Sequence, residues 1–151
     1  MNAQGVEMLK VRFSGSGTIN SLIAKRLGAG EVNDFANVYV YDGAKRLTSG
    51  KTFSSASGEV TFISLSVSVS GTKDLSLVAD MDSTNNTAGN VNYVQLVSVG
   101  ASGTVSGTPL SGNNMTTSGA SGGSVTIAKS GSLSDPTVGQ KKAQLSEFKI
   151  T

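Results

Sequence analysis

The chain has no cysteine, no histidine and no tryptophan among its 151 residues. Without histidine and cysteine it cannot build a Ser-His-Asp or Cys-His nucleophile, and it lacks the usual ligands of zinc and haem. An enzyme that uses carboxylates alone is still chemically possible, as in glycosidases. However, the ten acidic residues lie mostly beside turn residues or lysines, and no pair stands out. The sequence therefore predicts a protein that is not an enzyme and needs no cofactor.

Charge is also scarce, with a formal net charge of +2. The basic residues come in adjacent pairs such as Lys25-Arg26 and Lys141-Lys142, and neighbouring residues of a strand point to opposite faces. Binding of nucleic acid needs a clustered basic face with aromatic residues between the charges. We therefore expect no nucleic-acid partner. We also expect no membrane span, because no run approaches the roughly 18 apolar residues that a span needs.

The lack of charge is most pronounced between Ser83 and Ala128, where no charged residue occurs and Ser, Thr, Asn, Gly and Val dominate. Cytosolic domains usually stay soluble through interspersed charge. Long uncharged segments of this composition are typical of secreted bacterial surface proteins. No signal peptide follows Met1, and we interpret Met1 as an addition to an excised segment, with a cytosolic protein as the alternative. The expected location is extracellular, at the cell surface.

Apolar and polar residues alternate along most of the chain, which is the pattern of half-buried strands. The pattern predicts tight turns at Gly15–Gly17 and at Gly71–Lys73. It predicts strands over residues 8–14, 18–24, 59–70, 74–80 and 91–99.

The clearest local feature is a hairpin around Asp42-Gly43. The strand Asn37–Tyr41 precedes this dipeptide and the strand Ala44–Leu47 follows it. Asp-Gly between two alternating runs favours a type I′ turn, in which both central residues have positive φ.

Together these patterns predict an all-β protein, an antiparallel Ig-like or jelly-roll β-sandwich of about nine strands. The alternation weakens after Gly100. We therefore divide the chain into a β-sandwich core over residues 1–102, Gly/Ser-rich strands and a connector that complete the sheet over 103–142, and a terminal strand over 143–151.

The terminal strand duplicates the first. Met8–Ser14 aligns with Leu145–Thr151, and in both segments large apolar residues two apart alternate with charged ones. A duplicated strand at the end of a chain fits the cut end of a tandem array, or a strand that is exchanged with a neighbouring subunit. The alternative that any two half-buried strands look alike stays open. If the strand is exchanged, the expected apolar anchors are Leu145, Phe148 and Ile150, with Val11 and Phe13 as their counterparts.

Three segments are similar to a known family: 34–50, which contains the tyrosine and Asp-Gly hairpin, 58–80, which ends in Ala-Asp, and 124–131, which contains Val-Thr-Ile-Ala-Lys. They resemble tandem Ig-like repeats of secreted surface proteins of candidate-phyla (Patescibacteria-type) bacteria. Asp135–Gln140 resembles the proline-containing connector that precedes the next repeat. The resemblance implies an extracellular structural or adhesive role without catalytic residues.

Two groups of residues suggest a ligand. Tyr39 and Tyr41 share one face of their strand and could stack on a sugar, although tyrosines more often cover a sandwich core. Asp80, Asp82 and Asn85 place oxygen atoms close together, as calcium loops do, although a polar turn after a strand has the same composition.

The sequence thus favours a structural module, either an Ig-like repeat of a surface stalk or adhesin, or a filament subunit that donates a strand to its neighbour. Its partners would be further copies of itself, head to tail, or neighbouring repeats of a longer chain. The alternative is a β-sandwich that binds glycans or a host surface, with or without stabilisation by calcium.

Overall fold

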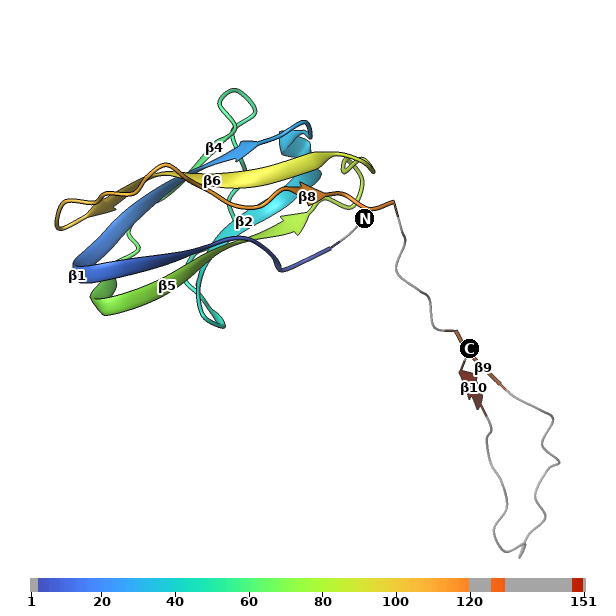
Figure 1. Ribbon diagram of the computed structural model, residues 1–151. Coiled ribbons are helices and arrows are strands. Elements are labelled where there is room, and N and C mark those ends of the chain that lie inside the picture. Colours follow the sequence, from blue (N-terminus) through green and yellow to red (C-terminus); the bar gives the residue numbers. More distant parts are fainter. Residues whose placement is uncertain (1–2, 120–125, 130–147, 151) are drawn as a thin grey trace, which may run out of the picture. The chain divides into compact units, whose positions relative to one another are not determined.

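The computed structural model describes residues 3–119, 126–129 and 148–150. They fall into two compact units, one within residues 1–120 and one within 121–151. The first unit is a curled antiparallel sheet of eight strands (Figure 1). Its strands are β1 (Val6–Leu27), β2 (Phe35–Asp42), β3 (Lys45–Arg46), β4 (Glu59–Phe62), β5 (Val67–Met81), β6 (Val91–Ala101), β7 (Leu110–Ser111) and β8 (Met115–Thr116), with one helical turn, η1 (Val32–Asp34).

The strands follow the order β3-β2-β5-β1-β6-β7, while β4 pairs with β1 and β8 pairs with β6. β1 is therefore the central strand, and its two halves have different neighbours. Residues 6–19 pair with β5. Residues 19–27 pair with β6 on the other side, and residues 22–25 also pair with β4.

The turns predicted at Gly15–Gly17 and Gly71–Lys73 are wrong, because both segments lie inside continuous strands. Gly15 pairs directly with Gly71, and both have positive φ, at 128° and 80°. Glycine adopts this backbone conformation without steric cost, so two strands can bend together while their pairing continues. The paired glycines produce the curl that Figure 1 shows at one end of β1 and β5.

The hairpin between β2 and β3 is confirmed, with its turn one residue later than predicted. Asp42 pairs with Lys45, so the turn residues are Gly43 and Ala44. Gly43 has φ +56°, whereas Asp42 keeps a strand conformation. Pairing of Asp42 with Lys45 places the only positive φ of this turn on glycine.

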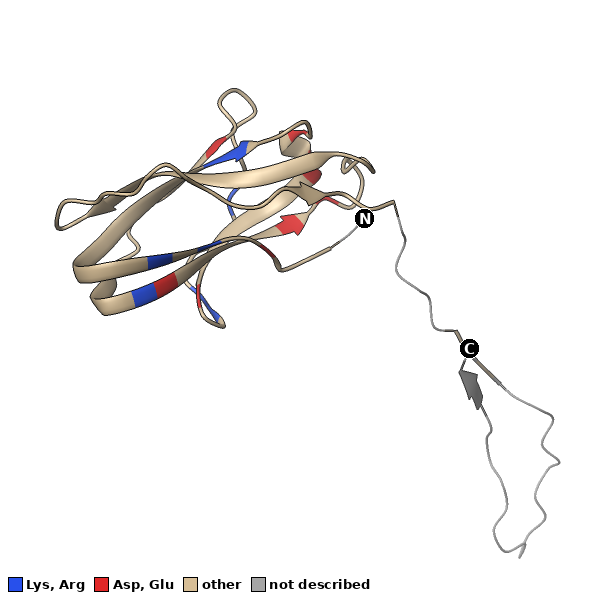
Figure 2. Ribbon diagram, in the orientation of Figure 1, with Lys and Arg blue, Asp and Glu red and all other residues tan. Residues whose placement is uncertain are grey.

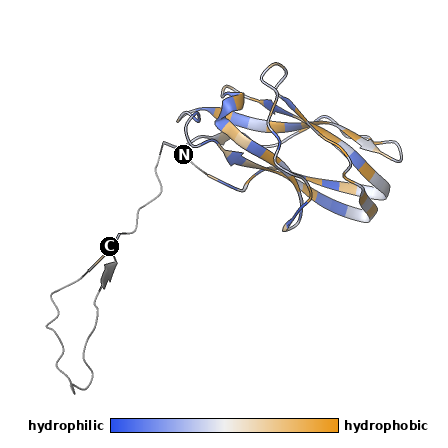
Figure 3. Cartoon of the chain, turned by 180° about the vertical axis from the view of Figure 1, so that it is seen from behind, coloured by the Kyte–Doolittle hydropathy of each residue, from blue (hydrophilic) through white to orange (hydrophobic). Residues whose placement is uncertain are grey.

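Hydrophobic and hydrophilic residues alternate along the strands (Figure 3). The alternation separates a buried face from an exposed one. In β1, Val11 is buried while Lys10 and Arg12 are exposed, as the sequence predicts. Met8 and Leu9 are both buried because the register with β5 shifts between Glu7 and Leu9. Such a bulge adds one residue and brings two neighbours to the same face.

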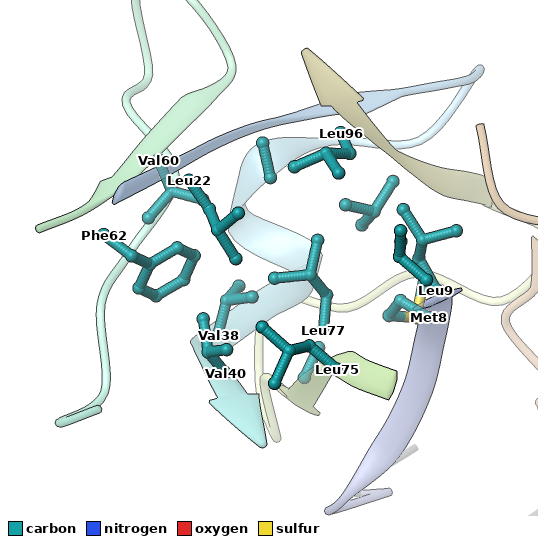
Figure 4. Close-up of a cluster of buried hydrophobic side chains, with 14 of the residues drawn as sticks. Met8, Leu9, Leu22, Val38, Val40, Val60, Phe62, Leu75, Leu77 and Leu96 are labelled. Atoms are coloured by element: carbon teal, nitrogen blue, oxygen red, sulfur yellow. The ribbon is translucent and has the colours of Figure 1, made fainter. Parts of the chain in front are cut away.

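The core lies inside the curl of the sheet. Side chains from β1, β2, β4, β5 and β6 converge there (Figure 4). Phe62, Val38, Val40 and Val94 have no exposed surface. Burial of this apolar surface is the main stabilising contribution of the unit.

The second unit contains β9 (Ile127–Lys129) and β10 (Phe148–Ile150), which form an antiparallel two-stranded sheet. Phe148 pairs with Lys129, Lys149 with Ala128, and Ile150 with Ile127. β7 and β8, which lie between Gly100 and Gly123, pair with β6 of the first unit. The division near residue 120 thus differs from the sequence-based boundaries after residues 102 and 142.

Candidate functional site

The most distinctive feature of the first unit is an unoccupied strand edge on β1. Within residues 3–119, 126–129 and 148–150, no strand pairs with the β6-facing edge of β1 before Ile19. Two hydrogen bonds between Thr18 and Ser102 close this stretch at one end. Ser102 N–H donates to the Thr18 carbonyl at 2.9 Å, and Thr18 N–H donates to the Ser102 side-chain Oγ at 3.0 Å. Near the other end, Gly112 approaches the Met8 carbonyl oxygen. We call the stretch between them, Leu9–Gly17, the open edge.

The direction of the backbone groups along the open edge follows from Thr18. Its N–H and its C=O both point toward Ser102, away from β5. In a strand these groups alternate between the two sides, residue by residue. The register with β5 does not shift between Leu9 and Ile19. Lys10, Arg12, Ser14 and Ser16 therefore direct their N–H and C=O groups to the open edge.

A groove of about 290 Å³ runs beside the open edge. Residues 103–108 form its far wall, and Leu110, which is 40% exposed, lies at its margin. Buried Val69 and Leu96 lie at its base. The lining mixes apolar side chains with Ser, Thr and Gly. An unpaired edge beside such a groove can bind an extended strand through main-chain bonds and alternate side chains.

The two strand-exchange counterparts predicted on the first strand both line this edge groove. Val11 is buried and Phe13 is partly buried. Of the predicted anchors on the terminal strand, Phe148 and Ile150 belong to β10, whereas Leu145 lies outside the described residues. The sequence analysis expected Gly/Ser-rich strands from residue 103 onward, whereas in the described structure no strand lies between Ala101 and Leu110, and residues 103–108 line the groove instead.

The predicted tyrosine pair is brought together on β2. The rings of Tyr39 and Tyr41 meet edge to face with centroids 6.3 Å apart. The Arg46 guanidinium lies 5.2 Å from the centroid of the Tyr39 ring. The Tyr39 hydroxyl donates to Asp80 Oδ2 at 2.8 Å, which with partial burial raises the pKa of Tyr39 above its usual value. A sugar that stacks on Tyr39 from the side of Arg46 would first have to displace the guanidinium.

The predicted calcium ligands are engaged in separate contacts. Asp80 accepts bonds from the Gly5 N–H and the Tyr39 hydroxyl. Asp82 Oδ1 accepts bonds from the N–H groups of Asn85 and Thr84 and from the Thr84 hydroxyl, which lower the pKa of Asp82. These are the bonds of a polar turn. In the described part of the chain, no three acidic side chains are grouped as a metal site would require.

A buried carboxylate that the sequence analysis missed lies at the far end of β1. Asp34 has no exposed surface and accepts bonds from Asn92 Nδ2 at 2.7 Å, Asn90 Nδ2 at 2.9 Å and Glu31 N–H at 2.9 Å. Burial raises the pKa of Asp34, but these bonds outweigh burial and lower it below the ordinary 3.8. Arg26 donates to Asn92 Oδ1 at 2.7 Å, which connects the cluster to β1. Asp, Asn and Gly in a loop resemble any turn, so the sequence carried no signal for it.

Searches of protein-family models, curated sequences and solved structures gave no match to this chain. No helix among the described residues is long and apolar enough to cross a membrane.

Proposed function

We propose that this protein is a non-catalytic extracellular structural module that joins its neighbours end to end through the open edge of β1. It is a repeat of a surface stalk or adhesin, or a subunit of a self-assembling filament. In this proposal the curled sheet is an Ig-like β-sandwich that lacks one strand. The observation that carries the proposal is the open edge itself, a row of backbone donors and acceptors next to a groove that Val11 and Phe13 help to line.

A strand from another copy of the same chain could close the open edge. Natural sheets usually protect their edges with charge, proline or a covering segment. Arg12 does not screen the open edge, because Asp74 on β5 binds its guanidinium through two bonds of 2.7 and 2.8 Å. A strand supplied by another copy would complete the row of bonds. Such contacts are head to tail and do not close on themselves, so they propagate.

The proposal is tested by light scattering coupled to size-exclusion chromatography, with negative-stain imaging of the same samples. We expect oligomers that grow with concentration. Arg12→Pro removes an N–H that faces the open edge and leaves the bonds to β5 in place, so it should abolish assembly without unfolding the sheet. Asp74→Ala is the matched control, since it breaks the same Arg12 ion pair and leaves the edge intact. Equal assembly of Arg12→Pro and wild type would contradict a role for the open edge.

The alternative is a glycan-binding module at Tyr39 and Tyr41. Its support is that both rings lie on one face of β2. A glycan array with wild type and Tyr41→Ala tests it. Selective binding that is lost in the variant would favour this alternative, and a calcium-dependent rise in melting temperature would favour a role for Asp80 and Asp82.

A further inference from the structure

The pairing of β10 indicates which strand the open edge binds. In the alignment of the first and last strands, Phe148, Lys149 and Ile150 correspond to Val11, Arg12 and Phe13. In this alignment β10 corresponds to the middle of β1. In the structure the partner of β10 is β9, with Lys149 opposite Ala128.

We propose that the open edge of β1 binds the strand Ile127–Lys129 of a second copy of this chain. The strand runs antiparallel to β1 in the register of the β9–β10 pair. Arg12 then lies opposite Ala128, and Phe13 lies opposite Ile127. This inference rests on the proposed structural function and deepens it, because it changes the expected donor from the terminal strand to β9.

The dimensions of the open edge fit this strand. Antiparallel addition centred on Arg12 places a three-residue strand within Leu9–Gly17, clear of Gly112 at one end and Ser102 at the other. Arg12 directs its N–H and C=O to the open edge, so it can form both bonds of a hydrogen-bonded pair with Ala128.

Two of the three residues of the strand fit the faces of β1, whereas Lys129, on the same face as Ile127, would lie opposite buried Val11. Residues directly opposite in an antiparallel pair lie on the same face. Phe13 lines the edge groove, so Ile127 would lie on the groove side, next to Phe13. Arg12 and Ala128 are both exposed, so Ala128 would lie on the outer face. Lys129 is opposite an apolar residue in both pairings, Phe148 in the structure and Val11 in the proposed contact.

Among the described residues of one chain, β9 pairs with β10 and no strand pairs with the open edge. We therefore assign the docked strand to another copy. β9 exchanges β10 for the equivalent segment of β1, so one pairing replaces another of the same kind. In this scheme β10 competes with the open edge for β9.

Disulfide trapping tests the register, and the absence of cysteine from the full chain means that each introduced thiol is the only one. An Arg12→Cys chain is mixed with an isotope-labelled Ala128→Cys chain and oxidised slowly. Opposite residues of a strand pair lie within the Cα separation that a disulfide spans. We expect a mixed-label dimer that forms at least tenfold faster than with Lys10→Cys or Ser14→Cys in place of Arg12→Cys. A combined Ala128→Cys and Lys149→Cys chain is the positive control for the β9–β10 register.

Three results would overturn the inference. Mixed dimers that form equally fast at all three positions would show that the register is wrong. A disulfide within one monomeric chain that carries both Arg12→Cys and Ala128→Cys would show that the chain docks its own β9. Loss of assembly on deletion of residues 143–151 would show that the terminal strand is the donor, whereas our scheme expects at least tenfold tighter assembly because the competitor is removed.

The failure of this inference is distinguishable from failure of the proposed function. If Arg12→Pro abolishes assembly but no Arg12–Ala128 disulfide forms, the open edge joins copies through a different strand, and only the inference fails. If the wild-type chain and the deletion variant are both monomeric at every concentration, head-to-tail association of this chain fails, and the inference fails with it.

Discussion

The two halves of β1 belong to one continuous strand, yet they have different surroundings. Residues 19–27 have β6 on one side and, over residues 22–25, β4 on the other. Residues 6–18 have β5 on one side and no paired strand on the other within the described residues. The sequence pattern of the two halves is similar, so strand propensity does not explain the difference. The difference lies in the pairing: one half has a strand on both sides over residues 22–25, and the other half carries the open edge to which the proposed function assigns binding.

Both halves of β1 carry charged residues, and the doubly paired half has the cross-strand pair Lys25–Glu59 at 3.7 Å between Nζ and Oε1, but the strands on the β6 side differ in charge from β5. On the half of β1 that pairs with β5, Arg12 forms a cross-strand ion pair with Asp74 of β5. Nearby, Lys73 Nζ of β5 lies 2.6 Å from Asp42 Oδ2 of β2. The strands on the other side, β6, β7 and β8, carry no charge (Figure 2). Cross-strand charge pairs help to fix a register. An uncharged Ser/Thr/Gly surface adds no like-charge repulsion when copies approach.

The largest effect is expected in the core of the doubly paired half. Leu22 is 2% exposed and lies opposite Phe62 of β4 and Val99 of β6. Leu22→Ala should lower the free energy of unfolding by about 2–5 kcal/mol through lost burial and a cavity. Val11→Ala, on the open half, should cost about 1–2 kcal/mol from the two methyl groups removed. Urea unfolding of both variants measures the two decreases in the free energy of unfolding. Equal decreases would mean that the two halves of β1 are equally well packed.

The next effect concerns the Asp34 cluster, which fixes the end of the doubly paired half through Asn92 and Arg26. Asp34→Ala leaves the buried amide of Asn92 and the Glu31 N–H without this acceptor. We expect a loss of about 2–4 kcal/mol in the free energy of unfolding. If Asp34→Ala lowered the free energy of unfolding by less than a substitution at an exposed position does, water would be replacing the carboxylate at no cost.

The same residue gives a pH dependence with a defined sign. The pKa of Asp34 is lowered in the folded state, so its stabilising contribution is complete above the ordinary value of 3.8 and is lost as the pH falls through the lowered value. Asp34→Asn cannot titrate at this position. The difference in unfolding free energy between wild type and Asp34→Asn should therefore be constant near neutral pH and should decrease below pH 3.8. A constant difference across the acid range would contradict the lowered pKa.

The sequence predicted the strands well and their connections poorly, for a physical reason. Alternation reports which face of a strand is buried, and this placed the segments of β1, β2, β5 and β6. Glycine pairs are ambiguous, because the positive φ that makes a tight turn also allows a bend within a paired strand. Only the cross-strand match of Gly15 with Gly71 decides between the two, and one sequence does not display that match.

The candidate site was predictable in part. Duplication of the first strand pointed to Val11 and Phe13, which do line the edge groove. The vacancy itself is a property of the sheet order, since it depends on β6 joining β1 only from Ile19 onward. This long-range pairing cannot be recognised from the local sequence of residues 9–17. Asp34 escaped prediction because its partners Asn90 and Asn92 are remote in sequence.

A smaller effect is expected at the glycine bend that joins the two halves. A Cβ at Gly71 would meet no atom within 4 Å, so only the backbone conformation opposes a side chain there. Gly71→Ala should cost about 1–2 kcal/mol because φ is +80°. Gly103→Ala is the matched control, since its Cβ also meets nothing and its φ is not in the left-handed region. Equal unfolding midpoints for the two variants would mean that the bend needs no special backbone.

The smallest effect should come from Asp74→Ala. This variant removes the ion pair with Arg12 but leaves the backbone of the open edge unchanged. The Arg12 side chain is 69% exposed, and pairs of this kind are screened by solvent and salt. We expect an unfolding midpoint close to that of wild type in physiological salt, and unchanged assembly. Assembly that fell as far in Asp74→Ala as in Arg12→Pro would show that the ion pair, by keeping the guanidinium away from the edge, is itself required for docking. The comparison of these two variants therefore separates the backbone of the open edge from the charge above it.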